Sequence, residues 1–231
     1  DGERTQPIAE DRARPGAAGS DSHKTPSVDA PAGSSPVLWV KPGEQVELFP
    51  EPGGEEPVKT VDRQTEFGSP TVFSVLDSRG RWAAVTTPYT ANGELAWVRL
   101  DPRRIGTGFV DHRIEVDLSE RRATLLQGDQ PLRGFSVTVG APDSPTPTGS
   151  FAITDTFKGD LSPVYGCCAL AISANQPLRP SGWIGGSRIA FHGTTGSLGV
   201  AASNGCVRAS DSDLIAMLNT VELGTPVEIH E

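Results

Sequence analysis

Short runs in which apolar and polar residues alternate, separated by turns that contain glycine or proline, limit what this chain can fold into. The runs at 45–49, 113–118 and 135–139 alternate with a period of two, which is typical of strands that bury one face. The chain has 26 glycines and 20 prolines among 231 residues, and this favours turn-rich β structure over long helices. The sequence therefore predicts a mostly β fold with one or two short helices.

Composition and turn signals divide the chain into three parts. Residues 1–35 contain no aromatic residue, leucine or cysteine. Such a segment cannot bury enough apolar surface to offset its ordering entropy, so we expect either a disordered tether or a terminus of no consequence. Residues 36–108 hold several strand-like runs and end in a polar, glycine-rich linker at 101–108. Residues 109–231 are predicted to form a second domain.

A short helix is expected near the end of the second domain. Ser210 is a suitable N-cap, because its hydroxyl can accept a hydrogen bond from the amide of Asp213 three positions later. The expected apolar face of this helix consists of Leu214, Ile215 and Leu218.

Charge and hydropathy exclude several classes of function. The net charge of −9 and the pI of about 5.0 argue against nucleic acid as a partner, because phosphate binding favours a basic face. No apolar run approaches the ~18 residues of a membrane span. The first residues, Asp-Gly-Glu-Arg, show no signal peptide. Three cysteines make a simple disulfide framework unexpected and leave one thiol for chemistry.

Two of the cysteines, Cys167 and Cys168, are adjacent, and three interpretations are open. Both could be reduced residues of the core or of a wall, they could form a vicinal disulfide, or one could line a site as a second thiol. In a strand their side chains would point to opposite faces. No metal site is expected, since zinc takes about four ligands and the nearby candidates are His192 and Cys206.

The residues that carry chemistry are concentrated between 191 and 210. His192 opens a His-Gly-Thr motif, and Cys206 lies in the segment Ser-Asn-Gly-Cys-Val-Arg at 203–208. A thiol is a nucleophile as thiolate, and a neighbouring imidazole is its usual general base. Glycine beside each residue allows tight backbone geometry, and the amides of Gly205 and Cys206 could bind one oxyanion. The pattern indicates a Cys/His acyl transferase or hydrolase.

These two blocks resemble the signature of the L,D-transpeptidase (YkuD) catalytic domain family. The residues at 114–122 and 139–149 are similar to that domain's opening hairpin and turn, so the resemblance extends from about 113 to the C-terminus. It implies a β-sandwich or barrel as the fold of the second domain. Many members have a second histidine where this chain has Asn204, and we interpret the difference as a variant site.

The middle part of the chain carries a second resemblance. The segment Arg-Gly-Arg-Trp at 79–82, followed by Gly-Glu-Leu-Ala-Trp-Val at 93–98, resembles a bacterial SH3-like β barrel. Two interpretations of Trp82 and Trp97 are open. They could line a groove for a ligand, or they could pack in the core, since both sit in strand-like runs.

The resemblance to the L,D-transpeptidase family implies a role for each residue of the two blocks. Cys206 would be the nucleophile and His192 the general base, with the carbonyl of Gly193 holding the imidazole. Arg208 could bind a substrate carboxylate bidentately, or it could form a structural ion pair with an aspartate of the following helix. The other expected substrate contacts are Asn204, Ser203, Thr194 and, near the base of a lid at 157–165, Tyr165.

The function implied by the family is peptidoglycan L,D-transpeptidation. An acyl-enzyme thioester would form from a stem tetrapeptide and pass to the side-chain amine of a diamino acid on a neighbouring stem, with no metal or cofactor. Carbapenem β-lactams would acylate the same thiol. We expect a monomer in the cell wall or periplasm, with its signal or anchor segment absent from this sequence. The alternatives are an L,D-carboxypeptidase or endopeptidase on the same fold and a non-catalytic cell-wall-binding protein.

Overall fold

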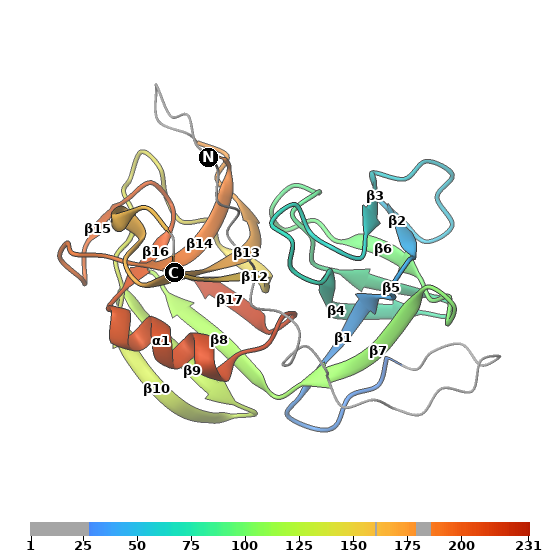
Figure 1. The fold of residues 1–231 in the computed structure, drawn as a ribbon, viewed down its shortest axis with the longest axis horizontal. Helices are drawn as coiled ribbons and strands as arrows, with labels where there is room; N and C mark the ends of the chain where they lie inside the picture. The colour runs from blue at the N-terminus through green and yellow to red at the C-terminus, as the bar shows by residue number, and fades with distance from the viewer. Residues whose placement is uncertain (1–27, 160, 179–185) are drawn as a thin grey trace.

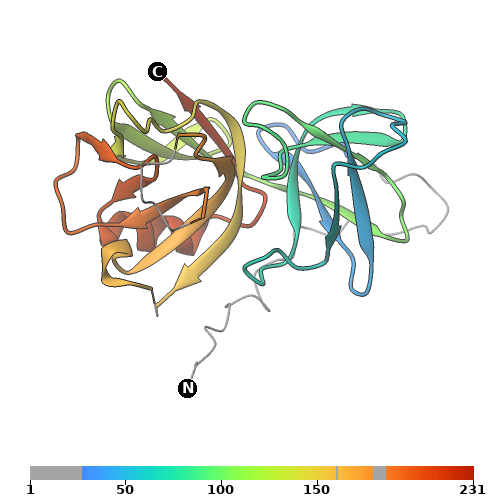
Figure 2. The same cartoon turned by 90° about the horizontal axis from the view of Figure 1, so that it is seen from above.

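The computed structural model describes residues 28–159, 161–178 and 186–231, and most of the regular structure in this part of the chain is β (Figure 1). A seven-stranded sheet from the first half of the chain and an eight-stranded sheet from the second half lie side by side, as the view from above also shows (Figure 2). The predicted mostly β fold is confirmed. Residues 1–27 of the predicted tether lie outside the described residues, and Ser35, its last residue, begins the first strand.

The first sheet has its own core. Its strands are β1 (Ser35–Val40), β2 (Gln45–Phe49), β3 (Lys59–Asp62), β4 (Val72–Arg79), β5 (Trp82–Val85), β6 (Ala96–Arg99) and β7 (Ile105–Val110). They run in the order β3-β2-β6-β5-β4-β1-β7, and every pairing is antiparallel. Trp97 is buried against Phe49 and Ala84, so core packing is the correct interpretation for this tryptophan. The SH3-like barrel stays a prediction.

Strand β7 corrects the predicted linker at 101–108. Its residues pair with β1 along the whole length of that strand. Its glycines suggested a linker, yet Gly106 is needed inside the strand, because a β-carbon there would lie 2.1 Å from the ring of Trp39. The first sheet therefore ends at Val110 rather than at 108, and β8 (His112–Asp117) follows at once.

The second sheet continues with strands from the rest of the chain. After β8 come β9 (Arg122–Gln127), β10 (Gln130–Ser136), β12 (Gly149–Lys158), β13 (Cys168–Asn175), β14 (Arg188–Gly193), β16 (Val207–Ala209) and β17 (Pro226–His230). Their order is β10-β9-β8-β17-β12-β13-β14-β16. The β14–β16 and β8–β17 pairs are parallel, and the other pairs are antiparallel. The parallel pair β14–β16 places the two motif blocks side by side.

Two strand bounds in this half were predicted incorrectly. The predicted strand at 135–139 consists of the end of β10 and the start of β11 (Val139–Gly140), which leaves the sheet and pairs with β15 (Ala201–Ser203). The region at 157–165 was expected to be irregular, but β12 continues to Lys158, and Pro163–Tyr165 form a 3₁₀ turn, η1.

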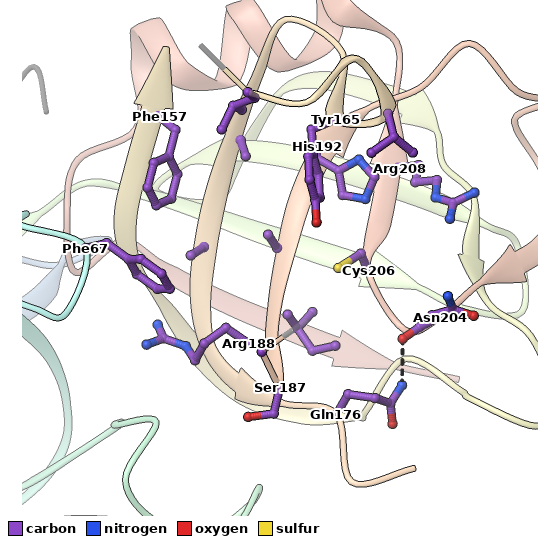
Figure 3. Close-up of a pocket in the computed structure, with 17 residues that line it drawn as sticks. Phe67, Phe157, Tyr165, Gln176, Ser187, Arg188, His192, Asn204, Cys206 and Arg208 are labelled. Carbon is purple, nitrogen blue, oxygen red and sulfur yellow. Dashed lines mark hydrogen bonds between the residues drawn. The ribbon is translucent and has the colours of Figure 1, made fainter. Parts of the chain in front are cut away.

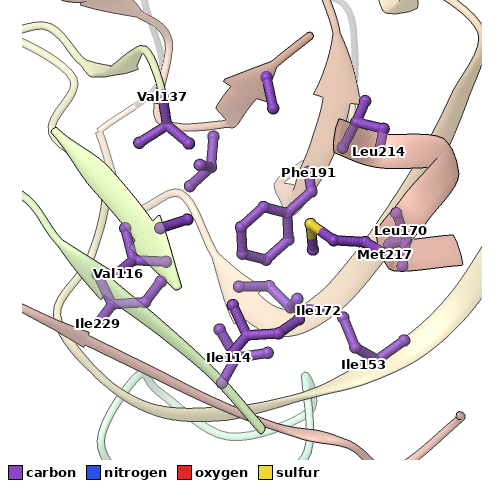
Figure 4. Packing of buried hydrophobic residues seen from close by; sticks show 14 of the residues in the cluster. Ile114, Val116, Val137, Ile153, Leu170, Ile172, Phe191, Leu214, Met217 and Ile229 are labelled. Atoms are coloured by element: carbon purple, nitrogen blue, oxygen red, sulfur yellow. The ribbon is translucent and has the colours of Figure 1, made fainter. Parts of the chain in front are cut away.

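Helix α1 (Asp211–Thr220) closes the core of the second half, where Phe191, Ile172 and Met217 are buried together (Figure 4). The sheet supplies most of this core, with alternate residues of β8, β12, β13, β14 and β17 pointing into it. This shared core fixes helix α1 against β14, the strand that carries His192.

The predicted cap of α1 is confirmed, because the Ser210 hydroxyl accepts a hydrogen bond from the amide of Asp213 at 3.2 Å. Leu214 and Met217 are fully buried, whereas Ile215 is 47% exposed. The predicted apolar face was wrong at Ile215, since each residue turns the helix by about 100° and positions three apart share a face. Among the described residues, no helix combines the length and apolar character needed to cross a membrane.

The adjacent cysteines, Cys167 and Cys168, form a disulfide, and Cys206 is free. The structure thus selects the vicinal disulfide from the three interpretations. Cys168 opens β13 and Cys167 precedes that strand, so the two residues do not occupy opposite faces of one strand.

Candidate active site

A pocket of about 490 Å³ opens on the second sheet and contains His192, Cys206 and Arg208 (Figure 3). One row of paired residues crosses four strands beneath it, namely Phe157, Ala169, His192 and Arg208. The next row on the same face consists of Asp155, Ala171 and Ala190. Since Ala169, Ala171 and Ala190 have small side chains, the floor leaves room for a ligand between Phe157 and His192.

His192, at the end of β14, is only 3% exposed. Its Nδ1 lies 2.7 Å from the carbonyl oxygen of Gly193, and since a carbonyl only accepts, we assign the proton to Nδ1 and the lone pair to Nε2. The ring of Tyr165 packs edge-on against the imidazole, with 4.9 Å between ring centres. Burial lowers the pKa of His192, the bond to Gly193 opposes this, and the charge of Arg208 lowers the pKa further. The net shift favours the neutral imidazole that a general base requires.

Gly193 is required by the turn that carries Tyr165. A β-carbon at Gly193 would lie 2.3 Å from Asp211 Oδ1 and 2.7 Å from the α-carbon of Gly166. The same carboxylate oxygen accepts a hydrogen bond from the amide of Cys167 at 3.2 Å. The start of α1, the turn η1 and the end of β14 therefore meet at this glycine, and this contact holds the tyrosine against the imidazole.

Cys206 carries the free thiol and is half-buried, directly before β16 and beside Ala190 of β14. Burial raises the pKa of the Cys206 thiol, while a hydrogen bond from the backbone of Ala190 and the charge of Arg208 act in the opposite direction. The raised pKa of the Cys206 thiol and the lowered pKa of His192 both favour a neutral thiol and a neutral imidazole over the charged pair.

The turn before Cys206 differs from the prediction at Ser203 and Gly205. Ser203 is 1% exposed, and its hydroxyl donates to the carbonyl of Cys206 at 2.6 Å, so it shapes the turn and does not face the pocket. Gly205 has a φ of 107°, which favours glycine, and its amide donates to Ser203 Oγ at 3.1 Å. This half of the predicted oxyanion hole is therefore already occupied by a protein oxygen.

Gln176 is a residue of the site that sequence reasoning missed. It is 6% exposed, and its Nε2 donates to the carbonyls of Ser144, Pro145 and Asn204 at 3.2, 3.0 and 3.1 Å. The bond to Asn204 is visible at the edge of the pocket (Figure 3). A glutamine in a loop gives no local signal of this role. It fastens the proline-rich loop to the turn that presents Cys206.

Arg208 lines the pocket without a carboxylate partner among the described residues. Its Nε is buried and has no hydrogen-bond partner there. The predicted alternative, an ion pair with the helix, is wrong, because Asp213 pairs with Arg133 at 2.7 Å and Asp211 accepts from Cys167. Arg208 is thus a cation in the pocket whose hydrogen-bonding capacity is partly unused.

The remaining predicted contacts divide between the pocket and its surroundings. Tyr165 and Asn204 line the pocket. Thr194 lies outside its lining, and its Oγ1 accepts a hydrogen bond from the amide of Gly196 at 3.0 Å. Within the described part of the chain, no three His, Cys, Asp or Glu side chains are grouped closely enough to hold a metal ion.

The model of the YkuD family, described as the L,D-transpeptidase catalytic domain, matches residues 111–229, which include both motif blocks. The chain belongs to this L,D-transpeptidase family. It is 28% identical over 122 residues to the protein YkuD of Bacillus licheniformis and 27% identical over 123 residues to YkuD of Bacillus subtilis strain 168, both of which carry an L,D-transpeptidase name. The matches cover 52% of this chain and 66% and 67% of the two relatives.

A solved L,D-transpeptidase of Enterococcus faecium is 20% identical to this chain, with a TM-score of 0.41. The match covers 52% of this chain and 50% of the Enterococcus protein. The chain therefore spans between half and about two thirds of the length of these relatives.

The pocket of this L,D-transpeptidase domain extends beyond the matched residues. Phe67, from the loop between β3 and β4 of the first sheet, lines it beside Phe157. Arg188 at the start of β14 also lines the pocket, and its guanidinium pairs with Glu66 of the same loop. Sequence reasoning assigned no role to Phe67, Glu66 or Arg188, and it placed Phe157 only at the start of the predicted lid at 157–165. The first half of the chain thus contributes directly to a wall of the site.

Proposed function

We propose that this protein is a peptidoglycan L,D-transpeptidase with Cys206 as nucleophile and His192 as general base. The observation that carries the proposal is one pocket that holds a free thiol, a buried imidazole with its Nδ1 bound to a carbonyl, and a guanidinium without a carboxylate among the described residues. The family supports the class of reaction. The motif residues are those that a thiol-dependent acyl transfer needs.

In the first half-reaction, Cys206 Sγ attacks the carbonyl carbon of the peptide bond between the L-centre and the terminal D-residue of a stem tetrapeptide. Nε2 of His192 takes the thiol proton as the S–C bond forms. When the tetrahedral oxyanion collapses, the C–N bond breaks and the imidazolium protonates the departing amine. Free D-alanine leaves, and a thioester on Cys206 remains. The amide of Cys206 is the proposed oxyanion donor, joined by that of Gly205 when it releases Ser203.

In the second half-reaction, the side-chain amine of a diamino acid on another stem attacks the thioester carbon. His192 accepts a proton from this amine and returns it to the sulfur as the C–S bond breaks. A new amide links the two stems, and the thiol is regenerated. Asn204 can donate a hydrogen bond beside the thiol but cannot act as a base, so all proton transfer is assigned to His192.

Arg208 is proposed to bind the carboxylate of the terminal D-residue. It stands beside His192 in the paired row and two residues beyond Cys206, so a carboxylate held there lies next to the scissile bond. A guanidinium can bind a carboxylate through two parallel hydrogen bonds. The Nε that has no partner in the described structure would gain one.

We also propose that the chain consists of a first module and a catalytic domain, and that their boundary, predicted between 108 and 109, lies after Val110 because β7 extends to that residue. Peptidoglycan as substrate places the protein outside the cytoplasm, in the cell wall or periplasm. The protein is proposed to act as a monomer and without a cofactor.

The proposed function is tested by intact mass after incubation with a carbapenem and by product analysis with a stem tetrapeptide. The wild-type chain should gain one drug mass, whereas Cys206→Ala, which retains the other two cysteines, should gain none. With tetrapeptide and a diamino-acid amine, the wild type should release D-alanine and form a cross-linked product.

Three outcomes would contradict parts of this proposal. D-Alanine release without cross-linked product, even at high amine concentration, would identify the L,D-carboxypeptidase. A drug adduct that persists in Cys206→Ala would assign the reactive thiol elsewhere. Neither adduct nor turnover, with retained sedimentation on cell-wall sacculi, would identify a wall-binding protein.

A further inference from the structure

A loop of the first sheet, Gln64–Pro70 between β3 and β4, reaches the catalytic pocket. Three consecutive residues of this loop contact the second sheet. The Thr65 hydroxyl donates to Asp155 of β12, Glu66 pairs with Arg188 of β14, and the ring of Phe67 packs edge-on against Phe157 of β12. The centres of the two phenylalanine rings are 5.4 Å apart, at an interplanar angle of 79°.

The loop is fixed in this position by its own hydrogen bonds. The amide of Thr65 donates to the carbonyl of Ser69 at 2.8 Å, and that of Gly68 donates to the carbonyl of Thr65 at 3.0 Å. A second contact between the two sheets supports it. Asn92 donates to the carbonyl of Asn175 at 2.6 Å, and the amide of Asn175 donates back to Asn92 Oδ1 at 2.9 Å. Phe67 is therefore held at the pocket before any ligand arrives.

The wall that Phe67 forms is apolar. Phe67 is 41% exposed, although it is a large apolar side chain, and its neighbours in the lining include Phe157, Leu161 and Val164. The charged groups just behind it are held together by one guanidinium, because Arg188 lies 3.7 Å from the carboxylate of Asp155 and also pairs with Glu66. An exposed aromatic surface inside a pocket is a surface for the C–H groups of a ligand.

The width of the sheet sets the distance between this wall and the reacting groups. Phe157 and Arg208 are the two ends of one paired row on β12, β13, β14 and β16. Neighbouring strands lie ~4.8 Å apart, so the ends of the row are separated by about 14 Å. An extended peptide advances ~3.3 Å per residue and crosses this distance in about four residues. A donor with its carboxylate at Arg208 thus brings its far end to Phe67 and Phe157.

We propose that Phe67 and Phe157 form an aromatic subsite for the end of the acyl donor farthest from the scissile bond, which makes the first module part of the donor site. The subsite recognises apolar C–H groups, either side-chain methyls of the peptide or the C–H face of the sugar that carries it. This inference rests on the proposed function, since the donor is a stem peptide of peptidoglycan. It assigns the module a role in substrate specificity, with Phe67 as a specificity-determining residue.

The test compares Phe67→Ala with wild type on two donors, a free stem tetrapeptide and the same peptide attached to its disaccharide. We expect kcat/KM to fall about tenfold, mainly through KM, which corresponds to the loss of one aromatic contact and its buried area. The matched control is Leu76→Ala, which removes a 44% exposed side chain of the same sheet outside the pocket lining. The rate of Cys206 acylation by a small β-lactam should not change in Leu76→Ala.

The pattern of losses identifies the ligand group. An equal loss with both donors assigns the subsite to the peptide, and a loss confined to the disaccharide donor assigns it to the sugar. An unchanged kcat/KM with both donors would overturn the proposal. Phe67→Leu, which keeps an apolar side chain, and a thermal unfolding curve for each variant exclude a loss that arises from misfolding.

Failure of the proposed function gives a different result. In that case wild-type protein releases no D-alanine, and calorimetric binding of the disaccharide tetrapeptide to Cys206→Ala replaces kinetics. Weaker binding after Phe67→Ala is added supports the subsite without the reaction. Equal binding by both proteins overturns the subsite alone, and no binding by either overturns the subsite together with the function.

Discussion

Two arginines on adjacent strands line the same pocket, and their surroundings are opposite. Arg188, on β14, donates to the carbonyl of Ile172 at 2.9 Å, pairs with Glu66 and lies 3.7 Å from the fully buried carboxylate of Asp155. Arg208, on β16, has no carboxylate partner among the described residues, and its Nε is buried without a hydrogen bond there. One guanidinium is used to build the wall of the pocket, and the other is available to a ligand.

The difference shows that contacts within the protein fix one end of the pocket, whereas the other end keeps a side chain that can bind a ligand. A buried guanidinium is costly unless it is paired, so the contacts of Arg188 fix the loop of the first sheet against the second. The incomplete contacts of Arg208 leave hydrogen-bonding capacity unused, which the proposed binding of a substrate carboxylate requires. Residue type and exposure do not distinguish these roles, whereas the hydrogen-bond and ion-pair partners of each arginine do.

The largest effect is expected from Arg188→Gln. The variant leaves the carboxylate of Asp155 buried without a cation, and breaking a buried pair in this way costs about 3–5 kcal/mol of unfolding free energy. Chemical denaturation measures this loss. Arg79→Gln is the control, because its ion pair with Asp77 is exposed and should contribute less than about 1 kcal/mol. Equal small changes in both variants would show that Arg188 does not hold the wall.

The next effect is expected from Arg208→Gln, and on catalysis instead of stability. Loss of a charged hydrogen bond to the substrate of about 1.5–3 kcal/mol lowers kcat/KM about 10- to 100-fold. Unfolding free energy should stay within about 0.5 kcal/mol of wild type, because Arg208 forms no ion pair with the described residues. A donor with an amidated terminal carboxyl group supplies the control. If Arg208 binds the carboxylate, the variant and wild type should turn over this donor at similar rates.

The sequence predicted the parts of the site that are local. His192, Gly193 and Cys206 belong to two motifs only a short loop apart, and the N-cap at Ser210 depends on contacts within one helical turn. Strand β7 was missed because its glycines suggested a linker, whereas Gly106 allows close packing against Trp39. Local patterns carry this kind of information only where the conformation is decided by near neighbours.

The wall of the pocket could not be predicted, because its contacts join distant parts of the chain. Glu66 and Arg188 are 122 positions apart, and neither residue has a motif that marks it. Gln176 is similar, since its three acceptor carbonyls lie about thirty positions away in either direction. Such residues are recognised by their partners, and only the folded chain brings the partners together.

The smallest expected effect is on the pH dependence of Cys206 acylation, which should differ between the two arginine variants. The pKa of His192 is lowered by burial and, in smaller part, by the charge of Arg208, so the acidic limb of the wild-type acylation rate should lie below pH 6.5. Removing the charge in Arg208→Gln should move this limb upward, toward 6.5, whereas Arg188→Gln should leave it in place. Acylation by a small β-lactam without a group for Arg208 reports the limb in all three proteins.

The lowered pKa of His192 also determines how the stability of the folded chain changes with pH. Because the pKa of His192 is lower in the folded chain, the unfolded chain binds more protons as the pH falls below 6.5, and His192 then contributes a loss of stability. Folding is unaffected by this group above 6.5, where both states are neutral. His192→Gln should remove this part of the acid dependence, and Arg208→Gln should reduce it. If the acidic limb of the acylation rate moves equally in Arg188→Gln and Arg208→Gln, the two arginines affect the pKa of His192 alike. The distinction between the two arginines is then wrong.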